Sequence, residues 1–426
     1  MPEGPRTREV PLRRGRLWLE PQGFRFAARG GSASSGRYCR YDDITHLGTV
    51  KGGLWIGTRQ GSVVLHRSRF EEADDPEWLA DWLLRTIGRS PAGDEQLARI
   101  ASIDDLVRSP LPRVATTVLA MLCGLGMWLQ FYQPFVGEVA AFAPSLVAEG
   151  EWWRIWTGSL LHSPFLFPIH LLSNLALILG FALLVERPLG PLATTVIIGA
   201  SVVGAMSFSA FAGYEQVIGA SGIAAGLVGA VMCLDLYFSE YLPAWWRLPR
   251  RMFISVLLLQ VAFDFLMPAV AGAAHMGGFV AGFFTTQLVA GPALRRSPQP
   301  NWVKLCCAAV VGTLLLSLLA PVPLLRREGG AMARHARVLL LVPNVTALRY
   351  NEIAWRMATE SNATHEQLQV ALEAAERAVY ATDRMDPDIL DTLAEVQYVS
   401  GDPVAAIHTR PTRIWPPPVS NVLIAL

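Results

Sequence analysis

Two residues with the chemistry of a nucleophile and a base open two separate apolar segments. Ser221 stands in the run Gly-Ala-Ser-Gly at 219–222, and His275 stands in the run Ala-His-Met-Gly-Gly at 274–278. A serine hydroxyl is a weak nucleophile until a base takes its proton, and histidine is the side chain best matched to that task near neutral pH. The pair therefore predicts acyl transfer through an acyl-enzyme on Ser221, with His275 as general base.

Small residues surround both candidates. Small residues on either side of a serine let another backbone or a substrate approach it closely. A serine directly before a helix also lies at the helix N-terminus, where negative charge is favoured. The segment that follows Ser221 carries glycines at spacings of four and three, and the segment that holds His275 carries two more at i+3 and i+7. Such faces let two membrane helices approach closely. We expect this contact to bring Ser221 within hydrogen-bond reach of His275; the supporting glycines are Gly219, Gly222, Gly278 and Gly282.

A second pair of polar residues predicts donors for an oxyanion. His170 and Asn174 are four residues apart in an apolar run, so on a helix they point the same way. Acyl transfer needs donors aimed at the oxygen on which negative charge develops. Together with the backbone N–H of Ser221, these two side chains are predicted to form that hole.

The other polar and sulfur-containing residues receive plainer interpretations. Asp264 is interpreted as a structural hydrogen-bonding residue near a helix end in preference to a third member of a triad. Two interpretations of His162 stay open: a contact within an interfacial loop, or a role in the access of water. The five cysteines are an odd number at no metal-ligand spacing. We therefore expect no disulfide framework, no metal site and no organic cofactor.

The elements that must position these residues are membrane spans. The chain has 426 residues, of which 52% are hydrophobic, and its net charge of +1 gives no global attraction to nucleic acid. Crossing a bilayer takes about 20 apolar residues. Seven runs meet that need, and we predict one span in each: 114–132, 169–186, 191–212, 219–238, 252–268, 273–291 and 303–322. The first run lies far from the N-terminus, so we expect no cleavable signal peptide.

Basic residues in the links predict the orientation of the chain. The link after the fourth run carries Arg247, Arg250 and Arg251, and the link after the sixth is basic as well. These links are expected to be cytoplasmic, together with the N-terminal domain, in a plasma membrane of bacterial type. Seven spans then place the C-terminal tail outside. Four arginines after the last run oppose that side: Arg326, Arg327, Arg334 and Arg337.

The segments outside the membrane differ in kind. Residues 1–90 alternate short apolar stretches with glycine-rich turns and end in an amphipathic helix, which predicts a small β-rich soluble domain that resembles a pleckstrin-homology fold. A linker follows at 91–112. After a second linker at 326–344, residues 345–409 carry two helical patterns that resemble tetratricopeptide helices, with a possible protein partner. The residues 410–426 are rich in proline and predict an irregular tail.

Four motifs occur together along the chain, in this order: Trp153-Arg154, His170-x-x-x-Asn174, the Gly-Ala-Ser-Gly run at 219–222, and Ala-His-x-x-Gly-x-x-x-Gly at 274–282. Together they resemble the rhomboid family of intramembrane serine proteases. The resemblance covers a core at 113–291, with 292–325 as a link and a seventh span. It implies a bundle of six helices plus one, a Ser221–His275 dyad, oxyanion contacts from His170 and Asn174, a loop at Arg154 that dips into the bilayer, and Glu186 as a structural acid.

The resemblance also implies the partners and leaves an alternative open. Substrates would be proteins with a transmembrane helix, cleaved within or beside that helix in the lipid bilayer. The position four after the serine is often aromatic in the family and stacks on the histidine, but here it is Ala225. What orients His275 therefore stays open. The alternative is a catalytically inactive rhomboid-like binder of membrane helices that acts as an adaptor, and a transporter is disfavoured because no inverted repeat is evident.

Overall fold

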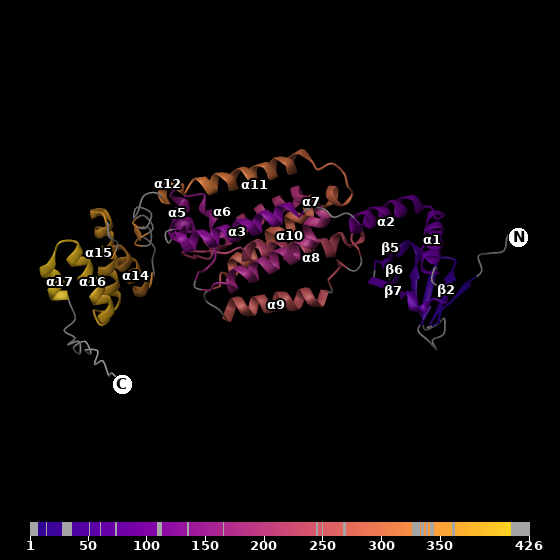
Figure 1. The fold of residues 1–426 in the computed structure, drawn as a ribbon, viewed down its shortest axis with the longest axis horizontal. Helices are drawn as coiled ribbons and strands as arrows, with labels where there is room; N and C mark the ends of the chain where they lie inside the picture. The colour runs from indigo at the N-terminus through magenta and orange to yellow at the C-terminus, as the bar shows by residue number, and fades with distance from the viewer. Residues whose placement is uncertain are drawn as a thin grey trace, which may run out of the picture. The chain divides into compact units, whose positions relative to one another are not determined.

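A computed structural model describes residues 7–13, 15–27, 36–50, 52–59, 61–72, 75–108, 113–133, 136–164, 166–243, 246–248, 250–266, 270–325, 345–359 and 363–409, with the single positions 333, 336, 337 and 340 (Figure 1). The chain divides into two compact units. The first comprises residues 1–125, 165–212 and 219–313, and the second comprises 126–164, 213–218 and 314–426. The predicted tail at 410–426 and most of the predicted linker at 326–344 lie outside the described residues.

The first unit begins with two antiparallel sheets. The first sheet has the order β1-β2-β3-β4 and the second has the order β5-β6-β7. Alternate side chains of β2 and β3 pair across the sheet, as in Leu17 opposite Phe26 and Leu19 opposite Phe24, and they bury one face. The strands are β1 (Arg8–Pro11), β2 (Arg16–Glu20), β3 (Gly23–Ala27), β4 (Arg37–Arg40), β5 (Ile44–Val50), β6 (Gly53–Thr58) and β7 (Gly61–His66).

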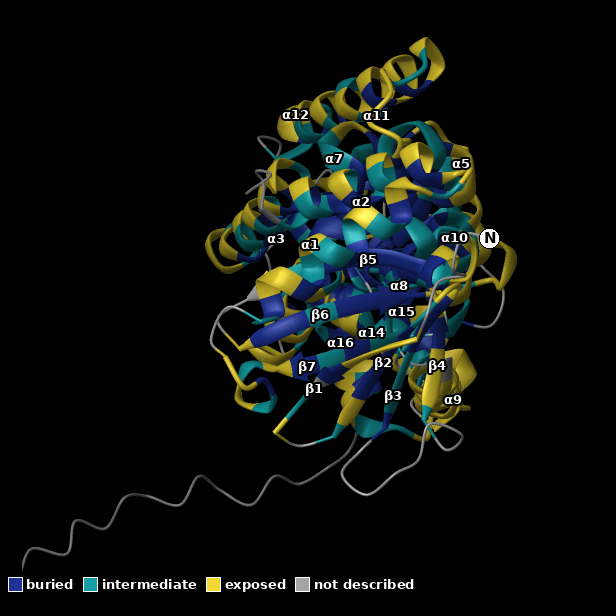
Figure 2. Cartoon of the chain, turned by 90° about the vertical axis from the view of Figure 1, so that its right-hand side faces the viewer, coloured by how far each residue is buried: buried dark blue, intermediate teal, exposed yellow. Residues whose placement is uncertain are grey.

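Two helices cover this β-rich domain. Helix α1 (Asp75–Gly88) buries Leu79, Leu83 and Ile87, which recur every four residues on one face. Helix α2 (Gly93–Arg108) fills most of the segment predicted as a linker, and the buried amide of Gln96 donates to the carbonyl oxygens of Tyr41 at 2.7 Å and Ile44 at 2.8 Å. Figure 2 shows β5 and β6 of the second sheet as mostly buried. The resemblance to a pleckstrin-homology fold stays a prediction.

Four helical segments are long and apolar enough to cross a membrane: α3 (Val114–Tyr132), α7 (Ile169–Phe211), α10 (Gly272–Leu294), and 301–325, which contains α11 (Asn301–Leu319) and α12 (Val322–Leu325). A shorter apolar helix, α8 (Ser221–Tyr237), occupies the fourth predicted run, and α9 (Arg250–Leu266) occupies the fifth. Every predicted run is thus mostly helical over its described residues, with non-helical positions only at the ends of runs and between α11 and α12. The count of seven spans stays a prediction.

Helix α7 combines two of the predicted runs in 43 residues. Its helical conformation breaks at Gly190, where φ is 76° and ψ is 171°, between Pro188 and Pro191. Proline removes a backbone donor, and a positive φ of this size suits glycine, so these residues explain the break. The second and third predicted spans therefore meet at Gly190 instead of being joined by a loop.

Helices α7, α8 and α10 form the centre of the first unit and lie side by side (Figure 1). Glycines make this possible. A side chain added at Gly278 of α10 would collide with the carbonyl oxygen of Gly222 of α8, and one added at Gly282 would collide with that of Gly226. Gly277 of α10 meets the backbone of α7 in the same way. These contacts are close backbone approaches of the kind that small residues permit in membranes.

Glu186 ties α7 to the start of α3. Its carboxylate is buried and accepts from the backbone N–H groups of Ala115 at 2.7 Å and Thr116 at 3.0 Å, and from the Thr116 hydroxyl at 2.5 Å. The first N–H groups of a helix have no partner within the helix, and the helix dipole favours an anion there. Glu186 therefore caps α3 from a residue far along the chain.

Replacing Glu186 with glutamine is expected to lower stability, because a neutral amide offers one acceptor oxygen to three donors. Hydrogen bonds to charged groups contribute about 1.5–3 kcal/mol, so we expect a loss of about that size. Thermal unfolding in detergent micelles measures it. The control is Glu376→Gln on an exposed helix surface, which should leave the transition unchanged; an equal loss from both changes would contradict the capping role.

The second unit contains three short helices, α4 (Val136–Ala140), α5 (Pro144–Ala148) and α6 (Arg154–Leu160). Arg154 is 2% exposed and organises them: its Nε donates to Glu151 at 2.5 Å and its Nη1 to the carbonyl oxygen of Ala141 at 2.7 Å. A buried arginine needs such partners. A bridge between Phe142 and Val217 joins this segment to residues 213–218.

The same unit ends in four helices: α14 (Ala347–Ala358), α15 (His365–Ala381), α16 (Pro387–Val399) and α17 (Pro403–Thr409). Their starts are capped by side chains, with a reciprocal capping box between Thr364 and Gln367 and with Asp386 before α16. Four alanines on one face of α15 are buried in the core of these helices: Ala371, Ala374, Ala375 and Ala378. The tetratricopeptide resemblance stays a prediction.

Candidate active site

Ser221 is the first residue of α8, and the preceding glycine sets its position. Gly219 has a φ of +121°, a conformation that other residues rarely adopt. A side chain there would also lie 3.0 Å from Nε2 of His170. The glycine therefore lets the chain turn into α8 while the His170 ring packs against it. The Ser221 hydroxyl lies beside this turn, about 3.9 Å from the same added atom.

His275 lies in the first turn of α10 and is buried to 9% exposure. Its Nδ1 lies 2.9 Å from Oδ1 of Asp264, and Nε2 of Gln260 lies 3.0 Å from the same Nδ1. Gln260 also donates to Asp264 Oδ1 at 2.7 Å. Asp264 lies two residues before the end of α9, as expected for a structural residue near a helix end, and its carboxylate contacts the predicted base.

The backbone contact between α8 and α10 brings the two predicted catalytic residues near each other. A side chain on Gly222, the residue after Ser221, would lie 3.4 Å from the carbonyl oxygen of Ala274, the residue before His275. No hydrogen bond joins Ser221 to His275, although both belong to the described residues. Catalytic hydrogen bonds are often long before substrate binds, so this geometry is compatible with a pair that tightens in the complex.

The predicted oxyanion donors start α7. His170 packs against Gly219, two residues before Ser221. Asn174 is 3% exposed, and its amide donates to the carbonyl oxygen of His170 at 2.8 Å. An amide has two N–H groups, so one is engaged with the helix backbone and one is left to bind another acceptor. Of the two side chains, His170 is the one that the contact with Gly219 places near Ser221.

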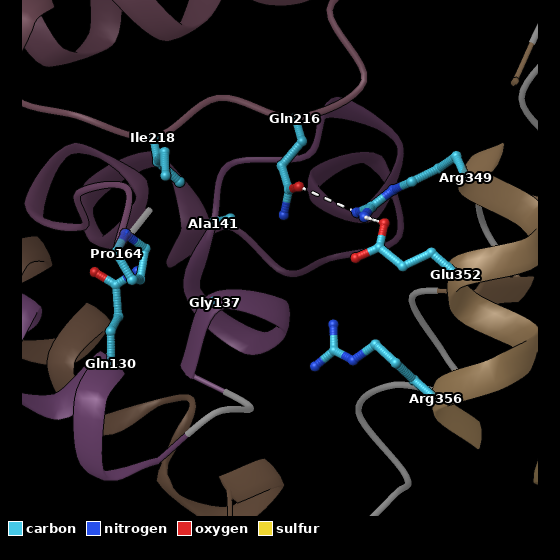
Figure 3. A pocket seen from close by; sticks show the side chains of 9 residues that line it. All are labelled: Gln130, Gly137, Ala141, Pro164, Gln216, Ile218, Arg349, Glu352 and Arg356. Atoms are coloured by element: carbon cyan, nitrogen blue, oxygen red, sulfur yellow. Dashed lines mark hydrogen bonds and ion pairs between the residues drawn. The ribbon is translucent and has the colours of Figure 1, made fainter. Parts of the chain in front are cut away.

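Two other predicted residues belong to the second unit. Arg154 has the structural partners given above, and His162 is fully buried with its Nδ1 3.3 Å from the carbonyl oxygen of Leu160. That unit also contains a pocket of about 260 Å³ whose polar lining includes Arg349 and Glu352, which form an ion pair at 2.8 Å (Figure 3). None of the predicted catalytic residues lines this pocket.

Sequence reasoning missed Gln260 and did not connect Asp264 with His275. A signal was present in the sequence, because these are two polar residues four apart inside an otherwise apolar run, and such pairs share one helix face. The same spacing identified His170 and Asn174. The interpretation of Asp264 as a structural residue does not take into account Gln260, one turn before it.

The described residues hold no group of three or more His, Cys, Asp or Glu side chains placed to bind a metal ion. The polar groups described around Ser221 and His275 are a hydroxyl, two imidazoles, a carboxylate and two side-chain amides. A base beside a nucleophile, with donors next to both, is the arrangement used for acyl transfer.

Comparison with known proteins identifies the family. A model of the rhomboid domain matches residues 149–292. The putative rhomboid protease YdcA of Bacillus subtilis is 32% identical over 183 residues, which cover 41% of this chain and 87% of that relative. RHOMBOID-like protein 5 of Arabidopsis thaliana is 34% identical over 35% of this chain and 48% of its own length. The rhomboid protease GluP of Bacillus subtilis is 28% identical over 35% of this chain and 28% of its own length.

The chain spans about half of the plant relative and little more than a quarter of GluP. The match to YdcA covers 87% of the length of that relative. The segment that the family model matches contains Arg154, His170, Ser221 and His275. The chain, a multi-pass integral membrane protein with several long apolar helices, belongs to the rhomboid family.

Proposed function

We propose that this protein is an intramembrane serine endopeptidase that cleaves peptide bonds within or beside the transmembrane helix of substrate proteins. The observation that carries the proposal is the close contact of Gly222 with Ala274 and Gly278, which brings the start of α8 to the start of α10. Ser221 and His275 are the neighbours of these contacts. The printed names of two relatives, both called rhomboid proteases, agree with this activity.

The proposed reaction has two steps. Ser221 Oγ bonds to the carbonyl carbon of the scissile peptide bond while its proton passes to Nε2 of His275. The tetrahedral oxyanion accepts from the Ser221 backbone N–H and from His170 and Asn174. The C–N bond then breaks, and His275 gives the proton to the leaving amine. Water repeats the sequence, with His275 again as base, and releases the acid from Ser221.

A substrate must offer an unwound segment. In lipid, a regular helix satisfies all of its carbonyl groups internally, so a nucleophile cannot reach them. Helix-breaking residues near one end of the substrate helix should therefore favour cleavage. Basic links after the fourth and sixth predicted spans support a cytoplasmic N-terminal domain, and seven spans would place the C-terminal tail outside. We also propose that the C-terminal tail binds another protein and that the N-terminal domain binds a ligand.

A fluorophosphonate probe tests the proposal. Ser221 Oγ would bond to phosphorus, fluoride would leave, and the serine proton would pass to His275. The purified protein in vesicles of phosphatidylethanolamine and phosphatidylglycerol should be labelled, and Ser221→Ala should not be. A folded wild-type protein that resists labelling would count against catalysis and favour the inactive binder, for which Ala225 in place of an aromatic residue is the supporting observation.

Replacing His170 or Asn174 with alanine is expected to lower kcat for a single-span reporter protein by about 10²–10³-fold, the effect typical of losing one oxyanion donor. The Michaelis constant should change little, because these contacts form with the transition state. Ser173→Ala is the matched control: Ser173 stands beside Asn174 but is exposed, and its hydroxyl donates to the carbonyl oxygen of His170 at 3.2 Å. Equal losses from Asn174→Ala and Ser173→Ala would contradict an oxyanion role.

A further inference from the structure

Helix α9 turns a single narrow stripe of side chains inward. Of residues 251–266, all are exposed except Phe253, Gln260 and Asp264, and Figure 2 shows this helix as mostly exposed. The three residues follow one another at spacings of seven and four, so they share one face. Polar side chains inside an apolar span are expensive and call for a specific partner. Two of the three inward positions of α9 are polar.

The partner of both is His275. Asp264 Oδ1 lies 2.9 Å from the ring Nδ1, Gln260 Nε2 lies 3.0 Å from the same nitrogen, and the two α9 side chains are joined at 2.7 Å. The side chains of His275 and Asp264 are only 11% and 17% exposed. The contact is thus a closed triangle of polar atoms largely removed from solvent.

We propose that Asp264 is a positioning residue for His275 and that Gln260 positions Asp264, so that the machinery of this protein is a Ser221–His275–Asp264 triad supported by Gln260. The inference rests on the proposed function. The contact with Asp264 would also orient the His275 ring. Ala225 cannot stack on that ring as an aromatic side chain would, and a carboxylate bound to Nδ1 holds it instead.

The triangle selects one tautomer of His275. Nδ1 has a single in-plane site, so it either donates to Asp264 or accepts from Gln260. A carboxylate is an acceptor only, and its charge makes the bond from Nδ1–H the stronger choice. With the proton on Nδ1, Nε2 is unprotonated and can take the proton of Ser221. The carboxylate also stabilises the imidazolium that forms in the reaction.

Gln260 then has a second task. With Nδ1 protonated, its amide cannot donate to the ring and donates to Asp264 Oδ1 instead. This bond holds the carboxylate in place within the apolar span. Without Asp264, the same amide would donate to Nδ1 and place the proton on Nε2, which is the wrong nitrogen for a base. Loss of the carboxylate should therefore do more harm than loss of the glutamine.

A glycine at the start of α10 permits the contact between Asp264 and His275. A side chain on Gly272 would lie 2.9 Å from Cβ of Asp264 and 3.2 Å from its Cγ, which is closer than ordinary packing allows. Glycine at this position lets Asp264 reach the first turn of α10, where His275 stands three residues later. The simpler alternative is that the triangle only ties α9 to α10, with no effect on the proton of His275.

The rate of fluorophosphonate labelling separates the two roles. In Asp264→Asn, which keeps the shape but replaces an acceptor oxygen with a donor, the limiting rate of labelling should fall by about 10³-fold or more, as for a triad carboxylate. The probe concentration at half-maximal rate and the unfolding temperature should stay at the wild-type values. Asp264→Glu should recover part of the lost rate, and Gln260→Ala should lose less than Asp264→Asn. Ser255→Ala, on the exposed face of α9, is the control and should label at the wild-type rate.

If the wild type and Asp264→Asn were labelled at equal rates, the triad would be overturned and the proposed function would stand. If the wild type were not labelled at all, the proposed function itself would be overturned. If Asp264→Asn unfolds, ¹⁵N NMR of histidine in Ser221→Ala decides the question. A proton on Nδ1 of His275 supports the proposal, and a proton on Nε2 overturns it.

Discussion

Replacing His275 with alanine is expected to slow cleavage of a single-span reporter protein by at least about 10⁴-fold. The physical reason is that His275 is the proposed acceptor of the serine proton, whereas His170, whose ring packs against Gly219, is proposed as an oxyanion donor. Ser221→Ala should cause a loss of similar size. Gel-based measurement of reporter cleavage in vesicles gives both rates.

The double variant provides the sharper result. Residues that act as one unit are strongly non-additive, so Ser221→Ala with His275→Ala should be no slower than either single variant. If the two losses multiplied, the residues would act independently and the shared proton transfer would be ruled out. Ala225→Gly is a control on the same helix, four residues after the nucleophile, and should keep most of the activity.

Replacing Gly278 with alanine is expected to have the second-largest effect. The added methyl group would collide with the carbonyl oxygen of Gly222, which is backbone and cannot rotate away. Overpacking of this kind typically costs about 1–3 kcal/mol. The helices must separate instead, and a displacement of about 1 Å in a catalytic arrangement can cost about 10²-fold in rate. Both stability and cleavage should therefore fall.

Gly180→Ala is the matched control for that experiment, because no atom lies within 4 Å of a methyl group added at this exposed position of α7. Alanine is the better helix former by about 1 kcal/mol, so this variant should be as stable as the wild type or more so. Unfolding temperature and cleavage rate are measured for both variants. If Gly278→Ala behaved like Gly180→Ala, the close approach of α8 and α10 would not be needed.

Much of the architecture could be predicted because its causes are local. Alternating apolar residues gave the strands of the N-terminal domain, and the acidic first turn with its proline gave the start of α1 at Asp75. The glycine spacings around Ser221 and His275 predicted a helix contact that the backbone of Gly222 and Gly278 makes. Apolar length located the helices of the membrane segments.

The rest depends on how distant residues meet. Hydropathy separates the runs at 169–186 and 191–212 but does not reveal that they join through a break at Gly190. Asp264 and His275 are 11 residues apart on different helices, so no helical periodicity links them. Asp264 viewed alone fits a helix end equally well. The contact of Asp264 with His275 also involves Gln260 and the close approach at Gly272, which come together only in the folded chain.

Glu186 also relates the order of synthesis to the order of assembly. A membrane protein is made from its N-terminus, and the first N–H groups of α3 leave the ribosome before their acceptor, which is 70 residues further along the chain. Away from water, each unsatisfied group costs several kcal/mol. The start of α3 therefore has to remain among water and headgroups until the first half of α7 has been inserted. A ribosome stalled before Glu186 should hold a first span that is still free to shift in depth.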